Sequence, residues 1–210
     1  MPTLSSRLLV VTDRHQTHGR PLVPLLQRVL AAVTPAIQLR ERDLSARELV
    51  TLACEVQALT ASHGSQLLIN DRIDVALALE GVGVHLRSNS LPVSVARQML
   101  GTQRLLGISA HSVEEVVQAA SQGADYIVLG PIYETPTKQM YGPPLGIHTL
   151  EKACGLIRIP IFGIGGVTAP RAREMRRAGA FGAAVITAIL GATDVESAAR
   201  ELVDAVTLVP

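Results

Sequence analysis

The segments IPIFGIGGVT (residues 159–168) and GAAVITAI (residues 182–189) decide the fold, because each passes from a strand-like apolar run into a turn. A helix-like segment from Pro170 to Ala178 follows the first turn. Gly165 and Gly166 leave backbone N–H groups uncovered, and the start of the following helix favours an anion. Two such turns after consecutive late strands are typical of the phosphate site of a (β/α)8 barrel.

The same alternation of strand and helix extends along the whole chain. Strand-like runs are predicted at residues 8–12, 36–40, 66–70, 83–86, 105–109, 125–130, 159–163 and 182–187. Helix-like segments lie between them, for example at residues 45–62, 112–122 and 194–206. Ser112 with Glu115 has the pattern of a capping box, and Asp194 is expected to cap the last helix.

Eight strands alternating with helices predict an α/β fold, a single-domain (β/α)8 TIM barrel spanning residues 1–210. The main alternative is a doubly wound open sheet, but the GxGxxG pattern of such sheets is absent after the first strand. Hydrophobic residues make up 48% of the chain and aromatic residues only 2%. That composition suits strands buried on both faces beneath Ala- and Leu-rich helices.

The charge pattern argues against a nucleic-acid partner. The formal net charge is +1, and the chain has no basic tract or aromatic platform. Four arginines do gather between residues 171 and 177, and their helical spacing indicates a solvated outer face. We therefore expect small-molecule partners.

Cysteine usage and hydropathy indicate the cellular compartment of the protein. Cys54 and Cys154 lack CxxC spacing, and we interpret both as small core residues in a reducing compartment. The N-terminus has no long apolar region, and no apolar run reaches membrane-spanning length. These features predict a cytoplasmic protein that does not enter a membrane, and they leave open whether it forms a homo-oligomer.

The segment GPIYETPTK (residues 130–138) carries the strongest chemical signal. It follows an apolar run and presents Thr135, Thr137 and Lys138 on a loop that Pro131 and Pro136 make extended. Two hydroxyls and an ammonium at a strand end suit an oxygen-rich anion, most simply a phosphate or a diphosphate. The alternative is a solvated loop with no binding role.

Other polar side chains follow the remaining strands, and in a barrel all of them meet at the carboxyl-terminal rim. In chain order they are Gln38, Arg40, Arg42, Asn70, Asp71, His85, Ser109, His111, Thr135, Thr137, Lys138, Gly165, Gly166, Ile186 and Thr187. Cations, one carboxylate, amides and hydroxyls around one opening suit a substrate carrying diphosphate. Asp71 is then available to hold a magnesium ion.

Several of these residues have a structural alternative. Asp71 could cap the helix that begins near Arg72, and Arg40 could pair with Asp71 or Glu41. His85 and His111 could simply bond neighbouring backbone groups. No single residue decides between the readings, whereas their convergence on one rim favours a binding site.

The motifs taken together resemble the thiamine phosphate synthase/TenI superfamily over essentially the whole chain. They are QLR (38–40), NDRID (70–74), GVHL (83–86), SAHS (109–112), GPIYETPTK (130–138) and GIGGV (163–167). The resemblance implies a TIM barrel that acts on a thiazole phosphate in thiamin biosynthesis.

Site roles follow from the resemblance position by position. Arg40, Ser109, Thr137 and Lys138 match ligands of the diphosphate of hydroxymethylpyrimidine diphosphate, with Gln38 and Asn70 on the pyrimidine side and Asp71 as a magnesium ligand. Thr135, Gly166, Ile186 and Thr187 match positions that hold the thiazole phosphate. The implied reaction is dissociative: diphosphate leaves, and the thiazole nitrogen captures the pyrimidine carbocation.

The sequence departs from that pattern in two loops. A synthase of this superfamily usually has Gly-Gln-x-Asp after the fourth strand, whereas this chain has Arg87-Ser88-Asn89-Ser90, with Ser90 in place of the second metal carboxylate. Arg42 stands where lysine is common. Both changes resemble the TenI branch, a thiazole tautomerase, but the position of that enzyme's acid/base histidine is Pro131 here.

The retained Asp71 and the TPTK run favour a synthase, which is a transferase. A TenI-type tautomerase, which is an isomerase, is the alternative, and His111 is then the candidate acid/base group. A third hypothesis is a non-catalytic barrel that binds thiazole phosphate and regulates, since both catalytic sets are incomplete.

Overall fold

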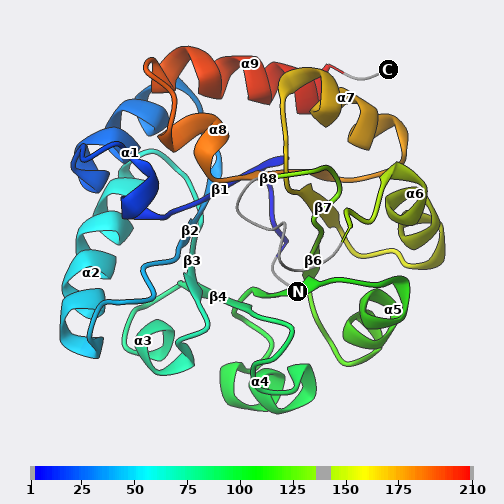
Figure 1. The fold of residues 1–210 in the computed structure, drawn as a ribbon. Coiled ribbons are helices and arrows are strands. Elements are labelled where there is room, and N and C mark those ends of the chain that lie inside the picture. The colour runs from blue at the N-terminus through cyan, green and yellow to red at the C-terminus, as the bar shows by residue number, and fades with distance from the viewer. Residues whose placement is uncertain (1–2, 136–142, 209–210) are drawn as a thin grey trace.

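The chain folds as a closed barrel of eight parallel strands (Figure 1). The computed structural model describes residues 3–135 and 143–208. Neighbours in the barrel are neighbours in the chain, and β1 and β8 pair to close the ring. The predicted (β/α)8 TIM barrel is therefore confirmed.

The predicted strands are found with their ends shifted by no more than two residues. The strands are β1 (Leu8–Val11), β2 (Ala36–Leu39), β3 (Leu67–Asn70), β4 (Gly83–Leu86), β5 (Leu106–Ala110), β6 (Tyr126–Leu129), β7 (Ile161–Ile164) and β8 (Gly182–Val185). The helices are α1 (Leu22–Ala32), α2 (Ala46–Ser62), α3 (Ile73–Leu77), α4 (Val93–Leu100), α5 (Val113–Ser121), α6 (Ile147–Leu156), α7 (Ala169–Arg177), α8 (Thr187–Leu190) and α9 (Val195–Thr207), and a short 3-10 turn covers Arg14–Gln16.

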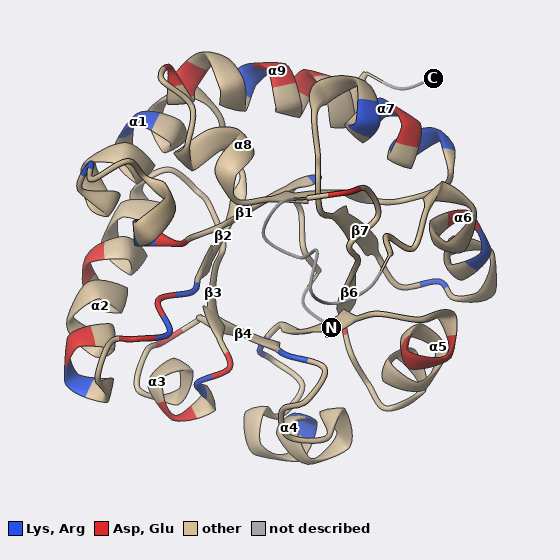
Figure 2. Cartoon of the chain, in the orientation of Figure 1, with Lys and Arg blue, Asp and Glu red and all other residues tan. Residues whose placement is uncertain are grey.

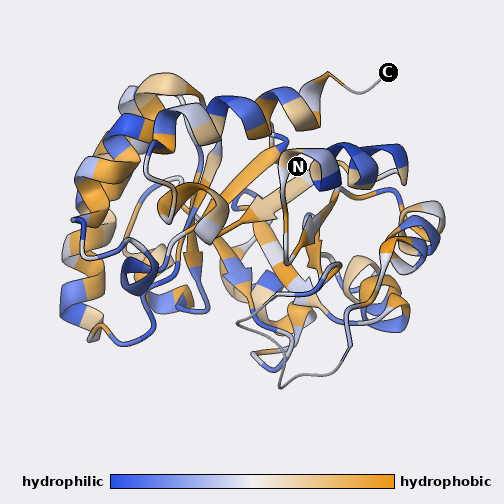
Figure 3. Cartoon of the chain, turned by 45° about the horizontal axis from the view of Figure 1, so that its top comes forward, coloured by the Kyte–Doolittle hydropathy of each residue, from blue (hydrophilic) through white to orange (hydrophobic). Residues whose placement is uncertain are grey.

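The apolar strands separate two layers of core. The outer layer fills the space between the sheet and the ring of helices, and Figure 3 shows the apolar strands at the centre. The inner layer fills the barrel itself and includes Leu9, Leu68, Tyr126, Val128 and Phe162. Because side chains alternate along a strand, each strand is buried on both faces, which explains the continuous apolar runs in the sequence.

Helix caps follow the sequence signals with one difference. Ser45 and Glu48 form a complete capping box at α2, and Asp194 accepts hydrogen bonds from two backbone N–H groups at the start of α9. Ser112 caps α5 by accepting from the Glu115 N–H. However, the Glu115 carboxylate accepts from the His111 N–H instead of closing the box on Ser112. The predicted capping box is thus half formed.

Two other predictions about the surface can be compared with the structure. Cys54 is exposed, so its interpretation as a core residue is wrong, whereas Cys154 is partly buried and burial raises the pKa of its thiol to about 11. None of the helices that the structure describes is long and apolar enough to cross a membrane.

The barrel interior depends on glycine beneath its few aromatic rings. A Cβ atom added at Gly107 would lie 2.0 Å from Cζ of Tyr126, which is fully buried. Tyr126 in turn meets Phe162 edge-on, with ring centroids 5.9 Å apart. Gly107 therefore makes the space in which the Tyr126 ring lies.

We predict that Gly107→Ala destabilises the barrel by about 1–3 kcal/mol or more, because the added Cβ would overlap the fully buried ring of Tyr126. Gly155→Ala is the matched control, since a Cβ there meets no atom within 4 Å and alanine is favoured inside α6. Urea denaturation of both variants measures the difference. Equal stability of the two would contradict this view of the interior.

Candidate active site

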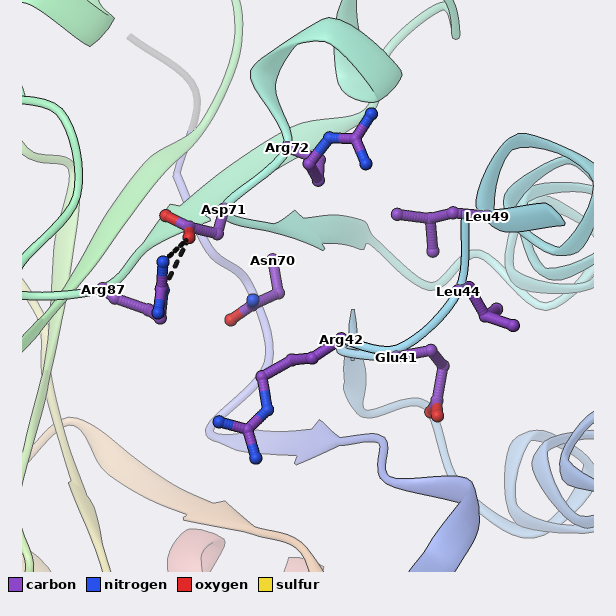
Figure 4. Close-up of a pocket in the computed structure, with 8 residues that line it drawn as sticks. All are labelled: Glu41, Arg42, Leu44, Leu49, Asn70, Asp71, Arg72 and Arg87. Atoms are coloured by element: carbon purple, nitrogen blue, oxygen red, sulfur yellow. Dashed lines mark hydrogen bonds and ion pairs between the residues drawn. The ribbon is translucent and has the colours of Figure 1, made fainter. Parts of the chain in front are cut away.

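Charged residues gather on the loops that follow β2, β3 and β4 (Figure 2). These loops enclose a pocket of about 180 Å³. Figure 4 shows its lining side chains, which are Glu41, Arg42, Leu44, Leu49, Asn70, Asp71, Arg72 and Arg87. The predicted strand-end residues from this side of the barrel are thus brought to one place.

Asp71 is held in the pocket wall by its backbone and by one arginine. Its φ is 63°, in the left-handed region that few non-glycine residues adopt, and its N–H donates to the His85 carbonyl. Nε and Nη2 of Arg87 both reach Asp71 Oδ2, at 2.6 and 2.5 Å. Oδ1 of Asp71 is buried and has no hydrogen-bond partner among the described residues.

The structural alternative for Asp71 is wrong. The N-cap of α3 is Arg72, and no side chain caps this helix. Arg72 instead pairs with Asp74, at 2.6 Å. A strained backbone and a buried, unpartnered carboxylate oxygen are features of a binding site more than of a helix cap.

Arg40 lies beside the loop after β1. Its guanidinium is 3.6 Å from the Asp13 carboxylate, so the predicted pairing with Asp71 or Glu41 is wrong. Burial lowers the pKa of Arg40, and nearby Arg42 lowers it further, although the group stays cationic at neutral pH. Two arginines this close to each other favour an anionic ligand.

Glu41 has a structural role next to that cation pair. Its carboxylate is buried and accepts hydrogen bonds from the Thr12 hydroxyl at 2.6 Å and the Arg14 backbone N–H at 3.1 Å. The Thr12 hydroxyl also accepts from the Arg40 N–H. Glu41 therefore ties the loop after β2 to the loop after β1 and holds the Arg40 backbone in place.

Gln38 and Asn70 form a buried amide pair on neighbouring strands. The Gln38 side-chain NH2 donates to the Asn70 side-chain oxygen at 3.0 Å. This bond leaves the Asn70 NH2 group and the Gln38 oxygen for other partners. A donor and an acceptor side by side can recognise a flat heterocycle.

Ser109 is connected to the barrel interior through His85. His85 Nε2 lies 2.9 Å from Ser109 Oγ, and Nδ1 lies 2.9 Å from Tyr126 Oη. Within the described chain, His85 Nδ1 is the one hydrogen-bond partner of the Tyr126 hydroxyl, so that hydroxyl must donate to Nδ1 to satisfy its proton. Neutral His85 then carries its proton on Nε2 and donates it to Ser109. The Ser109 hydroxyl keeps its own proton for a ligand at the rim.

His111 is oriented by the backbone. Its Nδ1 donates to the Gly130 carbonyl at 2.6 Å, because a carbonyl can only accept. Its own N–H donates to Glu115. The backbone-bonding alternative holds for His111, whereas His85 bonds two side chains.

The glycine turn after β7 packs against the loop after β6. Gly165 and Gly166 have φ values of 98° and 61°, and a Cβ at Gly166 would lie 2.5 Å from the Glu134 carbonyl oxygen. Only glycine fits both the conformation and the close approach. This packing brings Thr135, which is partly buried, to the same side of the barrel as the glycine turn.

Arg171 stabilises that turn, which corrects part of the prediction for the arginine cluster. Its guanidinium donates to the Gly166 carbonyl at 2.7 Å and lies over the Tyr133 ring. Arg176 is also partly buried and bonds backbone carbonyls, so only Arg173 and Arg177 form a solvated face.

The remaining predicted residues are placed as follows. Arg42 is exposed at the pocket, Ile186 is partly buried, and Thr187 is exposed at the first position of α8. Thr137 and Lys138 lie outside the described residues.

Among the predicted site residues, Asp71 supplies the carboxylate for a magnesium ion. Between residues 3 and 135 and between 143 and 208, no three His, Cys, Asp or Glu side chains group as metal ligands. Asp71 offers one unpartnered oxygen, while its other oxygen belongs to Arg87. Ser90 contributes only a neutral hydroxyl, and magnesium prefers carboxylates.

The family model described as thiamine monophosphate synthase matches residues 8–189. The chain belongs to this family. The thiamine-phosphate synthase of Moorella thermoacetica is 43% identical over 95% of this chain and 95% of its own length. That of Roseiflexus castenholzii is 41% identical over 93% of this chain and 86% of its own length. The solved structure of thiamine phosphate pyrophosphorylase from Pyrococcus furiosus superposes with a TM-score of 0.87, at 33% identity and 95% coverage of both chains.

For this member of the thiamine monophosphate synthase family, sequence reasoning missed several structural partners of the site. Asp13 pairs with Arg40, Tyr126 orients His85, and Thr12 links the first two strand ends. Thr12 and Asp13 could have been found, because they follow the first strand as the other site residues follow theirs. The role of Tyr126 could not, since it depends on strand register.

We predict that His85 stays neutral throughout the stable pH range of the folded protein. Burial lowers its pKa from 6.5 to about 3; Arg40 adds to this shift and Asp71 opposes it. Below pH 6.5 the unfolded state therefore binds a proton that the folded state does not, so stability is complete above pH 6.5 and falls as pH drops toward 3. The expected loss between pH 8 and pH 5 is about 2 kcal/mol.

Urea denaturation at the two pH values measures this loss. His85→Gln should lower stability overall but flatten the pH dependence, because glutamine donates and accepts without titrating. A His85 imidazole that titrates near pH 6.5 in the NMR spectrum of the folded protein would refute the prediction.

Proposed function

We propose that this protein is a thiamine-phosphate synthase, a transferase that couples hydroxymethylpyrimidine diphosphate to thiazole phosphate and releases diphosphate. The observation that carries the proposal is the set of arginines at the strand ends: Arg87 contacts Asp71, Arg42 lines the same pocket, and Arg40 lies near both arginines. A substrate that loses diphosphate needs such a set, whereas moving a proton on a thiazole does not. The names of the relatives described above support the same assignment.

The two substrates would occupy different parts of the rim. The Gln38–Asn70 pair suits the pyrimidine, and Arg40 and Ser109 suit its diphosphate. The turn at Gly165 and Gly166 suits the thiazole phosphate, together with Thr135, Ile186 and Thr187. Thr137 and Lys138 complete the diphosphate end in this proposal.

The proposed reaction breaks the C–O bond between the pyrimidine methylene carbon and the diphosphate. The electron pair leaves with the diphosphate, and the thiazole nitrogen forms the new C–N bond to the carbocation. Negative charge grows on the leaving group, so donors already fixed in place stabilise the transition state more than the ground state. Arg40 is such a donor because Asp13 and its backbone bond to Thr12 hold it. Ser109 is another, since His85 orients its hydroxyl.

Magnesium stays a prediction. Asp71 Oδ1 is the protein oxygen that an ion bound to diphosphate would meet. We also place the protein in the cytoplasm with small-molecule substrates, and its assembly into a homo-oligomer stays a prediction.

Incubating the purified protein with both substrates tests the proposal directly. We expect thiamine phosphate and diphosphate in equal amounts, measured by chromatography. A parallel incubation with the thiazole phosphate carboxylate tautomer alone tests for tautomerase activity. Tautomerisation without coupling at any magnesium concentration would overturn the assignment as a synthase.

The thiazole phosphate end can be tested at Gly166. Gly166→Ala should weaken thiazole phosphate binding by about tenfold or more, or roughly 1.4 kcal/mol, because the new Cβ meets the loop after β6. Gly101→Ala is the matched control, with φ of 66° and no atom within 4 Å of the added Cβ. Both glycines have a positive φ, and calorimetric titration with thiazole phosphate compares the two variants. Unchanged affinity in folded Gly166→Ala would place the phosphate elsewhere.

A further inference from the structure

Arg87 lines the pocket and has N–H donors that no described residue accepts. It follows β4, and Figure 4 shows its guanidinium directed at Asp71. Nε and Nη2 converge on the single oxygen Oδ2, and Nη1 has no hydrogen-bond partner in the described parts of the chain. The Arg87 side chain is 47% exposed although it lines the pocket, so a ligand can reach it.

The other charges of the pocket indicate the sign of charge that it would bind. Glu41 is satisfied by Thr12 and Arg14, and Arg72 is paired with Asp74. Asp71 is shared with Arg87. Arg42 makes no ion pair with any residue that the structure describes, and Arg40 has only the 3.6 Å contact with Asp13. Positive charge is therefore in excess, and the pocket as built attracts an anion more than a second cation.

We propose that Arg87 binds the diphosphate group of the substrate directly, with Asp71 acting as the residue that positions its guanidinium. This inference rests on the proposed function and deepens it, because it names a ligand of the leaving group. The planar fork of a guanidinium matches two phosphate oxygens, and a charged donor of this kind works without a metal bridge. Arg87 thereby supplies fixed positive charge in a pocket whose one available carboxylate oxygen is Asp71 Oδ1.

Arg87 would act together with Arg40, which follows β2. β2, β3 and β4 are adjacent in the barrel, so residues that follow them lie along one arc of the rim. A diphosphate has two phosphoryl groups and can meet both guanidinium groups at once. Asp71 between them limits the repulsion when the site is empty of anion.

Calorimetric titration of the protein with inorganic diphosphate, first in EDTA and then with saturating magnesium, tests the inference. The wild-type protein should bind in EDTA. Arg87→Ala should weaken that binding by about tenfold to a hundredfold, as for loss of a hydrogen-bonded charged group. Arg87→Lys keeps the charge without the fork and should recover part of the affinity. Arg72→Ala is the matched control, because Arg72 lines the same pocket but is paired with Asp74, and it should leave binding unchanged.

Binding that requires magnesium, or equal binding by folded Arg87→Ala and the wild type in EDTA, would overturn the inference. Coupling activity is measured on the same samples. A protein that makes thiamine phosphate but binds diphosphate independently of Arg87 refutes this inference alone. A protein that binds diphosphate through Arg87 but makes no thiamine phosphate refutes the proposed function alone.

Discussion

The hydrogen bonds between β1 and β8 are the constraint on which the rest of the structure depends. They pair Leu8, Leu9 and Val10 with Ala183, Ala184 and Val185 and so close the sheet into a ring. The closure requires Gly182, where a Cβ atom would lie 1.9 Å from the Arg7 carbonyl oxygen. A closed parallel barrel has all its strand carboxyl ends on one rim, so residues far apart in the chain meet there. Without that closure the glycine turn after β7 and the arginines after β2 would not lie on the same rim.

The polar residues at the rim fall into two sets. One set bonds other protein groups, and the other keeps hydrogen-bonding atoms that a ligand can use. Glu41, Arg14, Thr12 and Asp13 bond one another or hold the backbone. Ser109 keeps a free proton because Tyr126 and His85 fix the direction of the hydrogen bonds below it. Desolvation keeps His85 neutral, which that arrangement requires. The site is thus organised before a ligand arrives, and such preorganisation lowers the cost of stabilising charge in a transition state.

The sequence predicted the fold correctly for a physical reason. Strands buried on both faces must be apolar along their length, and the carboxyl ends of such strands can be read directly as site positions. Contacts set by register and loop path could not be predicted from the sequence: Arg87 reaches Asp71, and Arg171 reaches Gly166. Cys54 was assigned to the core because cysteine is usually buried, but its position on α2 faces outward. Magnesium, and the roles of Thr137 and Lys138, stay predictions.

A crystal structure of the protein with thiamine phosphate and diphosphate tests the central claim most directly. The account predicts the thiamine phosphate group against the turn at Gly165 and Gly166, and the diphosphate between Arg40, Ser109 and Arg87. The pyrimidine should lie over the Gln38–Asn70 pair. Diphosphate bound away from the ends of β2, β4 and β5, or a phosphate distant from the turn after β7, would contradict it.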